Sequence, residues 1–194
     1  MTKTKHWNLG IWDVRKKSEF WNALAKKKNA TFKTITTVSK DLNRLELSFD
    51  YEKVQVIFTE TDTKPLFIEC NFSSEAGLPW FEIAKVDLIE KLMSRFSKHK
   101  IKSTNQELNQ KYLIKGTDNQ AVSEMINNKK IIGIILRENL TCIEGKPGKN
   151  GTYKLSLNIH RNINNLEQLE AIYNLTLTLI DRLKRKRDGY EHPI

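Results

Sequence analysis

The sequence is poor in the residues that mark specialised classes of protein. Its 194 residues include only 2 Cys, 4 Pro and 8 Gly, which excludes collagen-like, proline-rich and disulfide-rich chains. No run of apolar residues approaches the ~20 that a helix needs to cross the hydrocarbon core of a bilayer. With 39% hydrophobic and 29% charged residues, the composition predicts a soluble globular protein.

The motifs that identify many enzymes and nucleotide-binding proteins are also missing. The chain contains no GxSxG, HExxH, GxGxxG or GxxxxGK[ST] pattern. Its four histidines lie in four separate segments, and none has a Cys or a carboxylate at metal-ligand spacing: His6, His99, His160 and His192. The sequence therefore predicts no metal, no cofactor and no catalytic residue. It favours a binding protein, with an enzyme as the third alternative.

The two cysteines, Cys70 and Cys142, fall in predicted strands and do not form a CxxC motif. We expect free thiols, as in a reducing compartment, with a disulfide or a reactive thiol as the alternative. Residues 1–10 are polar and lack the apolar centre of a secretory signal. These features predict a cytoplasmic protein.

The net charge of +10 is unevenly distributed. Residues 1–34 contain nine basic and two acidic side chains, whereas residues 43–82 contain three basic and eight acidic ones. Lysines at helix ends can simply complement the helix dipole. If the basic clusters met in space, however, they would bind nucleic acid or an anionic membrane surface. The candidate contacts are Lys26, Lys27, Lys28, Lys91, Arg95, Lys98, Arg185, Lys186 and Arg187.

Hydrophobic periodicity predicts an α+β fold with a mainly antiparallel sheet. A meander of four strands is expected first, a C-terminal hairpin later, and single strands between them. The expected strands are 31–38, 44–49, 53–59, 65–72, 80–83, 111–115, 140–144 and 153–159.

Helices are expected to pack on this sheet. An N-terminal helix over 18–28 has Ser18 as its cap, a central helix covers 87–98, and a long C-terminal helix starts after Asn164 or Asn165. A shorter helix starts at Thr117 or Asp118. The asparagines 127 and 128 separate it from a buried helical turn at 131–136.

The chain length favours one domain over residues 1–194. The order of elements also allows two sheet-then-helix halves, at about 17–98 and 108–186. The polar segment 98–110 is the expected linker or surface crossing, and residues 187–194 are expected to be a frayed tail.

Two segments resemble binding sites, although turns explain them more simply. The segment Gly145–Gly151 contains Lys146 and Lys149 among glycines, as a phosphate-binding loop does. Such a loop leads into a helix, however, and here Asn150-Gly151 leads into a predicted strand. The Asn-Gly pair therefore predicts a hairpin turn. Glu60 and Asp62 alternate with threonines, a pattern that would suit a hard cation. A solvated turn accounts for these residues without any bound ion, and we favour it.

Several segments resemble an uncharacterised family of bacterial α+β proteins. They are residues 20–25, residues 58–66, residues 107–118 followed by a helix, the late hairpin, and the end of the last helix at 180–183. Related chains usually have Asp in the segment before the central strand, where this chain has Asn109. The family has no established activity, so the resemblance implies a fold and no catalytic residue.

Taken together, the residues favour a non-enzymatic protein that binds a protein partner or a small ligand through its sheet. Binding of nucleic acid or of an anionic membrane surface through the basic clusters is the alternative. Neither the identity of the ligand nor an oligomeric state follows from the sequence.

Overall fold

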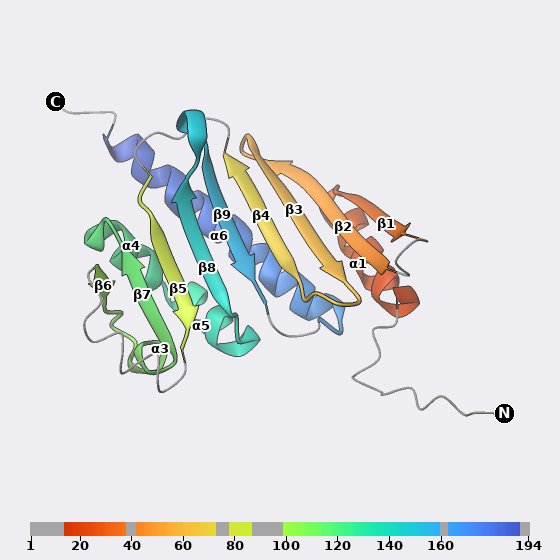
Figure 1. Cartoon of the computed structure of the whole chain (residues 1–194), viewed down its shortest axis with the longest axis horizontal. Helices are drawn as coiled ribbons and strands as arrows, with labels where there is room; N and C mark the ends of the chain where they lie inside the picture. Colours follow the sequence, from red (N-terminus) through yellow and green to blue (C-terminus); the bar gives the residue numbers. More distant parts are fainter. Residues whose placement is uncertain (1–13, 38–41, 73–77, 87–98, 160–162, 191–194) are drawn as a thin grey trace.

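The computed structural model describes residues 14–37, 42–72, 78–86, 99–159 and 163–190. The strands in these ranges form one nine-stranded sheet in the order β1-β2-β3-β4-β9-β8-β5-β7-β6 (Figure 1). Every pairing in this sheet is antiparallel. This result confirms the predicted α+β fold with a mainly antiparallel sheet.

The first four strands form the predicted meander. They are β1 (Thr31–Thr37), β2 (Leu42–Tyr51), β3 (Val54–Thr61) and β4 (Phe67–Phe72). The two residues that connect β2 to β3, Glu52 and Lys53, both have positive φ. This is the backbone of a two-residue hairpin turn, whose twist matches that of the flanking strands. Among the described strands, β1 pairs only with β2, so it forms one edge of the sheet as described.

The predicted C-terminal hairpin joins the meander to the remaining strands. Its strands are β8 (Cys142–Pro147) and β9 (Tyr153–Asn158), and β9 pairs with β4. In the connection, Asn150 and Gly151 both have positive φ, as expected for a turn at Asn-Gly. Beyond β8 lie β5 (Phe81–Lys85), β7 (Tyr112–Gly116) and β6 (Lys100–Ile101).

Four helices cover one face of the sheet (Figure 1). They are α1 (Val14–Lys28), α4 (Asn119–Ile126), α5 (Lys129–Glu138) and α6 (Leu166–Tyr190), and α6 runs diagonally behind the central strands. Short polar side chains fix three of the helix starts. Asp118 accepts a hydrogen bond from Ala121 N at 2.9 Å, Asn128 accepts one from Lys130 N at 2.9 Å, and Asn165 accepts one from Gln168 N at 2.9 Å. None of the helices in the described ranges is both long and apolar enough to span a bilayer.

The core lies between the sheet and these helices. Alternate strand residues point into it, because successive side chains of a strand point to opposite faces. Fully buried residues come from strands β2 to β5 and β7 to β9 and from all four covering helices: Trp21, Leu24, Leu45, Leu47, Val56, Phe58, Ile68, Phe72, Phe81, Ile114, Ile126, Ile131, Ile135, Ile143, Leu155, Leu157, Ile172 and Leu179. The side chains on the helix face of the sheet therefore pack against the helices and form the core.

The structure corrects two sequence predictions, and another falls outside the described residues. α1 begins at Val14, so Ser18 lies inside the helix and does not cap it. The polar segment 98–110 is no simple linker, because it contains β6 and most of α3 (Gln106–Lys111). α6 ends at Tyr190, and the frayed tail expected at 187–194 stays a prediction. The central helix predicted at 87–98 falls on residues that are not described.

Candidate binding site on the bare face of the sheet

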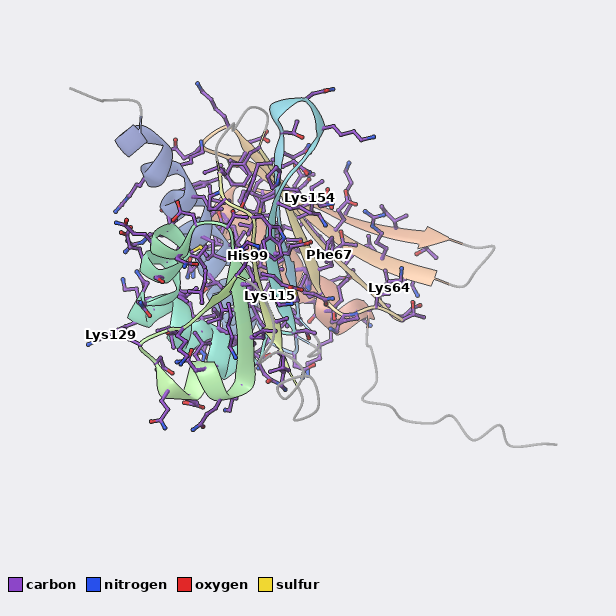
Figure 2. All side chains as sticks on the ribbon, turned by 60° about the vertical axis from the view of Figure 1, so that its left-hand side comes forward. Lys64, Phe67, His99, Lys115, Lys129 and Lys154 are labelled. Atoms are coloured by element: carbon purple, nitrogen blue, oxygen red, sulfur yellow. The ribbon has the colours of Figure 1, made fainter. Side chains whose placement is uncertain are left out.

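The other face of the sheet is not covered by α1, α4, α5 or α6 (Figures 1 and 2). Register places Thr59, Phe67 and Asn158 opposite one another across β3, β4 and β9 on this bare face. In Figure 2, Phe67, Lys64 and Lys154 lie on the bare side, whereas Lys129 lies on the helical side. The large apolar residues that are most exposed in the described ranges both belong to this face: Ile35 at 39% and Phe67 at 38%.

A hollow of about 840 Å³ opens on this face over β2, β3, β4 and β9. Its size is in the range of sites that hold small molecules. It combines apolar, hydroxyl, amide and charged groups, and its lining residues are Arg44, Ile57, Thr59, Thr61, Thr63, Lys64, Pro65, Phe67, Glu69 and Asn158. We refer to it as the Phe67 hollow.

The strand register gives the Phe67 hollow two different ends. At one end Arg44 lies opposite Thr61, and the turn that follows brings in Thr63 and Lys64. Four residues away along β3, at the other end of the hollow, Ile57 lies opposite Glu69. Because a strand rises about 3.3 Å per residue, the four positions from residue 61 to residue 57 span roughly 13 Å.

Two carboxylates near the hollow are already paired. Arg44 forms an ion pair with Glu46 on the same strand, and Lys154 on β9 forms one with Glu69 on β4. Burial alone would raise the pKa of Glu69, but hydrogen bonds from Lys154 and Asn71 outweigh it, so the pKa lies below its ordinary value. Glu69 is therefore ionised and engaged at neutral pH.

The part of the bare face over β8, β5 and β7 carries further ion pairs. Lys115 lies 3.5 Å from Glu82, and Lys146 lies 2.7 Å from Glu144. Glu82 and Glu144 are directly opposite each other on β5 and β8, an arrangement that repels unless cations compensate it. This region, which we call the polar zone, separates the Phe67 hollow from the β6 edge.

The acidic segment Thr59–Thr63 divides between two environments. Thr61 Oγ1 accepts hydrogen bonds from Lys64 N at 2.8 Å and from Thr63 N at 3.3 Å, and Asp62 accepts one from Asn43 N at 3.2 Å. These contacts confirm a turn at Thr61–Lys64. Glu60, however, is not part of that turn.

Glu60 lies at the end of β3 on the helix face and is 1% exposed. Its carboxylate forms an ion pair with Lys17 of α1, which is 5% exposed. The Lys17 ammonium also donates to the carbonyl oxygen of Ile163 at 2.9 Å. The expectation of a solvated Glu60 is therefore wrong, because its partner lies 43 residues away in the sequence.

Other candidate residues do not converge on the hollow. Cys70 and Cys142 are both free. His99 is exposed and is not among the residues that line the hollow, and the remaining histidines are not described. Within the described part of the chain, no three His, Cys, Asp or Glu side chains are grouped so as to hold a metal ion. The 145–151 loop leads from β8 to β9 and not to a helix, as the hairpin interpretation predicted.

The lysines at the end of α1 lie far from Arg185, the described member of the C-terminal basic cluster. Lys27 pairs with Glu170 at 2.6 Å, and the Lys28 ammonium lies 5.1 Å from the centre of the Tyr173 ring, both near the start of α6. Arg185 is exposed near its other end, and a helix rises about 1.5 Å per residue, so Glu170 and Arg185 are roughly 22 Å apart. Lys26 is exposed. The side chains of Lys91, Arg95, Lys98, Lys186 and Arg187 are not described, so a shared basic surface stays a prediction.

The sequence contained a signal for the hollow that alternation alone does not show. In residues 65–68, Pro-Leu-Phe-Ile is apolar at consecutive positions, so β4 must place an apolar side chain on both faces. Leu66 and Ile68 are buried, and Phe67 points outward. Ile57 between Val56 and Phe58 gives the same signal on β3.

No family model matches the chain, and a search of curated proteins gave no match, in agreement with the resemblance to a family without an established activity. Among solved structures, the chain is similar to the crystal structure of the mycobacterial trehalose monomycolate transport factor A, TtfA. The TM-score is 0.49 and the sequence identity 6%, and the match covers 86% of this chain and 93% of that chain. At this level of similarity the match supports no statement about a ligand or a partner.

Proposed function

We propose that this protein is a non-enzymatic binding protein that takes the apolar part of a small ligand, or of a partner protein, into the Phe67 hollow. One observation carries the proposal: Phe67 is 38% exposed in a hollow of about 840 Å³ on a sheet face that none of the four described helices α1, α4, α5 and α6 covers. Leaving a large apolar side chain in water costs free energy that a ligand recovers by covering it.

The lining of the hollow supports binding more than catalysis. Its ionisable side chains are Arg44, Lys64 and Glu69. The Glu69 carboxylate has a lowered pKa and is held by Lys154 and Asn71, so it is a poor general acid.

We also propose that the protein acts in the cytoplasm. Both cysteines are free, which is the usual state of thiols in a reducing compartment. Burial raises the pKa of Cys142 to about 11, so its thiol stays protonated and reacts slowly at neutral pH.

The test uses a neutral, apolar fluorescent probe, N-phenyl-1-naphthylamine, titrated against the full-length protein. We expect saturable binding to the wild type and about tenfold weaker binding to Phe67→Ser, which corresponds to ~1.4 kcal/mol. Ile35→Ser is the matched control, because Ile35 is equally exposed on the same face but does not line the hollow. Its affinity for the probe should stay within about twofold of the wild type.

The proposal fails if the wild type does not bind the probe, or if Phe67→Ser and Ile35→Ser bind it equally well. Circular dichroism and thermal midpoints of the variants establish that each remains folded, which is expected because both positions are exposed strand sites.

A further inference from the structure

We infer that the ligand of the Phe67 hollow is an anionic amphiphile, with an apolar body over Phe67 and a carboxylate, sulfonate or phosphate group beside Lys64 and Arg44. This inference rests on the proposed function and adds the chemical class of the ligand. It follows from the unequal distribution of charge between the two ends of the hollow.

The apolar body has a continuous surface on which to lie. Ile57 and Phe67 project from neighbouring strands, and Pro65 precedes Phe67 at the start of β4. Thr59 lies directly opposite Phe67 and contributes a methyl group beside the ring. An apolar chain or ring placed here covers the side chain that the fold leaves exposed.

The head of the ligand meets a cationic end with unused donors. Within the described residues, the ammonium of Lys64 has no ion-pair partner. Arg44 uses one Nη to bind Glu46, and a guanidinium has five N–H donors. Its Nε is buried and has no hydrogen-bond acceptor among the described residues. Thr61 and Thr63 add hydroxyl groups at the same end.

Among the described residues, the carboxylates near this end leave Lys64 without an ion-pair partner. Glu69 pairs with Lys154, Glu46 pairs with Arg44, and Asp62 accepts a hydrogen bond from the backbone N–H of Asn43. Anionic oxygens would therefore be attracted to Lys64 and Arg44, where a hydrogen bond between charged groups is about twice as strong as one between neutral groups. The roughly 13 Å between the two ends matches a single extended small molecule.

The polar zone argues against a broad macromolecular surface as the occupant. A flat partner or a membrane that covered β8 and β5 as well would have to strip water from the pairs Lys115–Glu82 and Lys146–Glu144. Dehydrating charged groups costs several kcal/mol for each ion unless new partners replace the water. A small amphiphile that stays over β3 and β4 avoids that cost.

The test compares two fluorescent probes that differ by one group. 8-Anilinonaphthalene-1-sulfonate carries a sulfonate, whereas N-phenyl-1-naphthylamine has the same rings without it. At low salt we expect the wild type to bind the sulfonate probe about tenfold more tightly, an advantage of ~1.4 kcal/mol. The advantage should shrink at high salt, because salt screens exposed charges.

Lys64→Gln should remove most of this advantage and leave the affinity for the neutral probe within about twofold. Because Lys64 is an exposed turn residue, the variant should fold, and Arg44→Gln then tests the second cation. Lys129→Gln is the control, since Lys129 is exposed on the helical side (Figure 2), and it should leave both affinities unchanged. Unlabelled dodecanoate should displace both probes, whereas inorganic phosphate alone should not displace the neutral one.

Equal affinities for the two probes, or an unchanged advantage in Lys64→Gln, would overturn the anionic head while the proposed function stands. Displacement of the sulfonate probe by phosphate but not by dodecanoate would show a simple anion site and would also overturn the inference. Absence of binding by both probes removes the proposed function itself, so the two failures are distinguishable.

Discussion

Lys17 and Glu60 are both withdrawn from solvent between α1 and β3, at 5% and 1% exposure. Each charge depends on the other, because an isolated charge in a protein interior is very costly. The pair therefore fixes the position of α1 on the sheet. It also links α1 to the backbone that precedes α6, through the hydrogen bond to the Ile163 carbonyl at 2.9 Å.

We expect Lys17→Met to lower the free energy of unfolding by about 3–5 kcal/mol, because the variant leaves the Glu60 carboxylate buried without its cation. Urea denaturation, followed by circular dichroism, measures the change. The double variant Lys17→Met/Glu60→Leu should recover most of the loss, since an apolar pair of similar volume needs no desolvation of charge. A double variant as unstable as the single one would show that the ion pair itself supplies net stability.

A second example at the residue scale is Asn109, where both the oxygen and the nitrogen of the side-chain amide form hydrogen bonds. Its Oδ1 accepts from Ser103 N at 2.9 Å, and its Nδ2 donates to Ser103 O at 2.6 Å. The Asp that is usual in the family it resembles has no donor for that carbonyl when ionised. Asn109 therefore has a structural role in the turn before α3.

At the scale of elements, replacing either of two glycines by alanine should change the free energy of unfolding, but in opposite directions. A Cβ on Gly145 of β8 would overlap the Tyr153 hydroxyl and the Phe81 ring, whereas a Cβ on Gly133 of α5 meets nothing within 4 Å. Gly145→Ala should lower the free energy of unfolding by about 1–3 kcal/mol through overpacking. Gly133→Ala should raise it by about 0.5–1 kcal/mol, because glycine is unfavourable inside a helix.

Thermal and urea unfolding of the two variants measure these changes side by side. Gly133 is exposed and its helix is otherwise unchanged, so it reports helix propensity alone. Equal effects at the two positions would contradict the packing of Tyr153 and Phe81 against β8.

Most elements could be predicted from the sequence because local signals specify them. Asp118, Asn128 and Asn165 each stand just before a helix and cap it, and alternation located β2, β3 and β9. α3 was missed because Leu108 is its one buried residue, which is too few for periodicity. The start of α1 was predicted four residues too late. Lys17 lies on the buried side of the helix, but in the sequence it resembles a surface residue because its ion pair with Glu60 is not apparent there.

At the scale of the whole molecule, α6 and the continuous sheet connect the two predicted halves. α6 packs against α1 on one side and against α4 and α5 on the other, and β4 pairs with β9 across the middle of the sheet. We therefore propose that the chain unfolds as one cooperative unit.

Leu24→Ala in α1 and Ile135→Ala in α5 test this proposal from opposite ends of the molecule. Both side chains are fully buried, so each variant should lose about 2–5 kcal/mol. In both variants, tryptophan fluorescence and far-ultraviolet circular dichroism should give one coincident transition. A separate early transition in Ile135→Ala, with the remainder unchanged, would show two independent domains.

The Phe67 hollow also depends on the arrangement of the whole molecule, so the sequence contains only a partial signal for it. The consecutive apolar residues of β4 indicate that one of them faces outward, but only the register places Arg44 beside Thr61 and Asn158 beside Phe67. These pairs are 17 and 91 positions apart in the sequence, and no local pattern connects them.

The free edge at β1 has a consequence for how copies of the protein meet. Among the described strands, this seven-residue strand has a neighbour on one side only, so its other side offers backbone amides and carbonyls to another extended chain, including the same strand of another molecule. Lys33, exposed midway along β1 between Thr31 and Ile35, brings like charges together when two such edges approach. Lys33 thus disfavours edge-to-edge association of β1 strands into fibril-like assemblies. Its replacement by an apolar residue would enlarge the exposed apolar surface to which Ile35 already contributes.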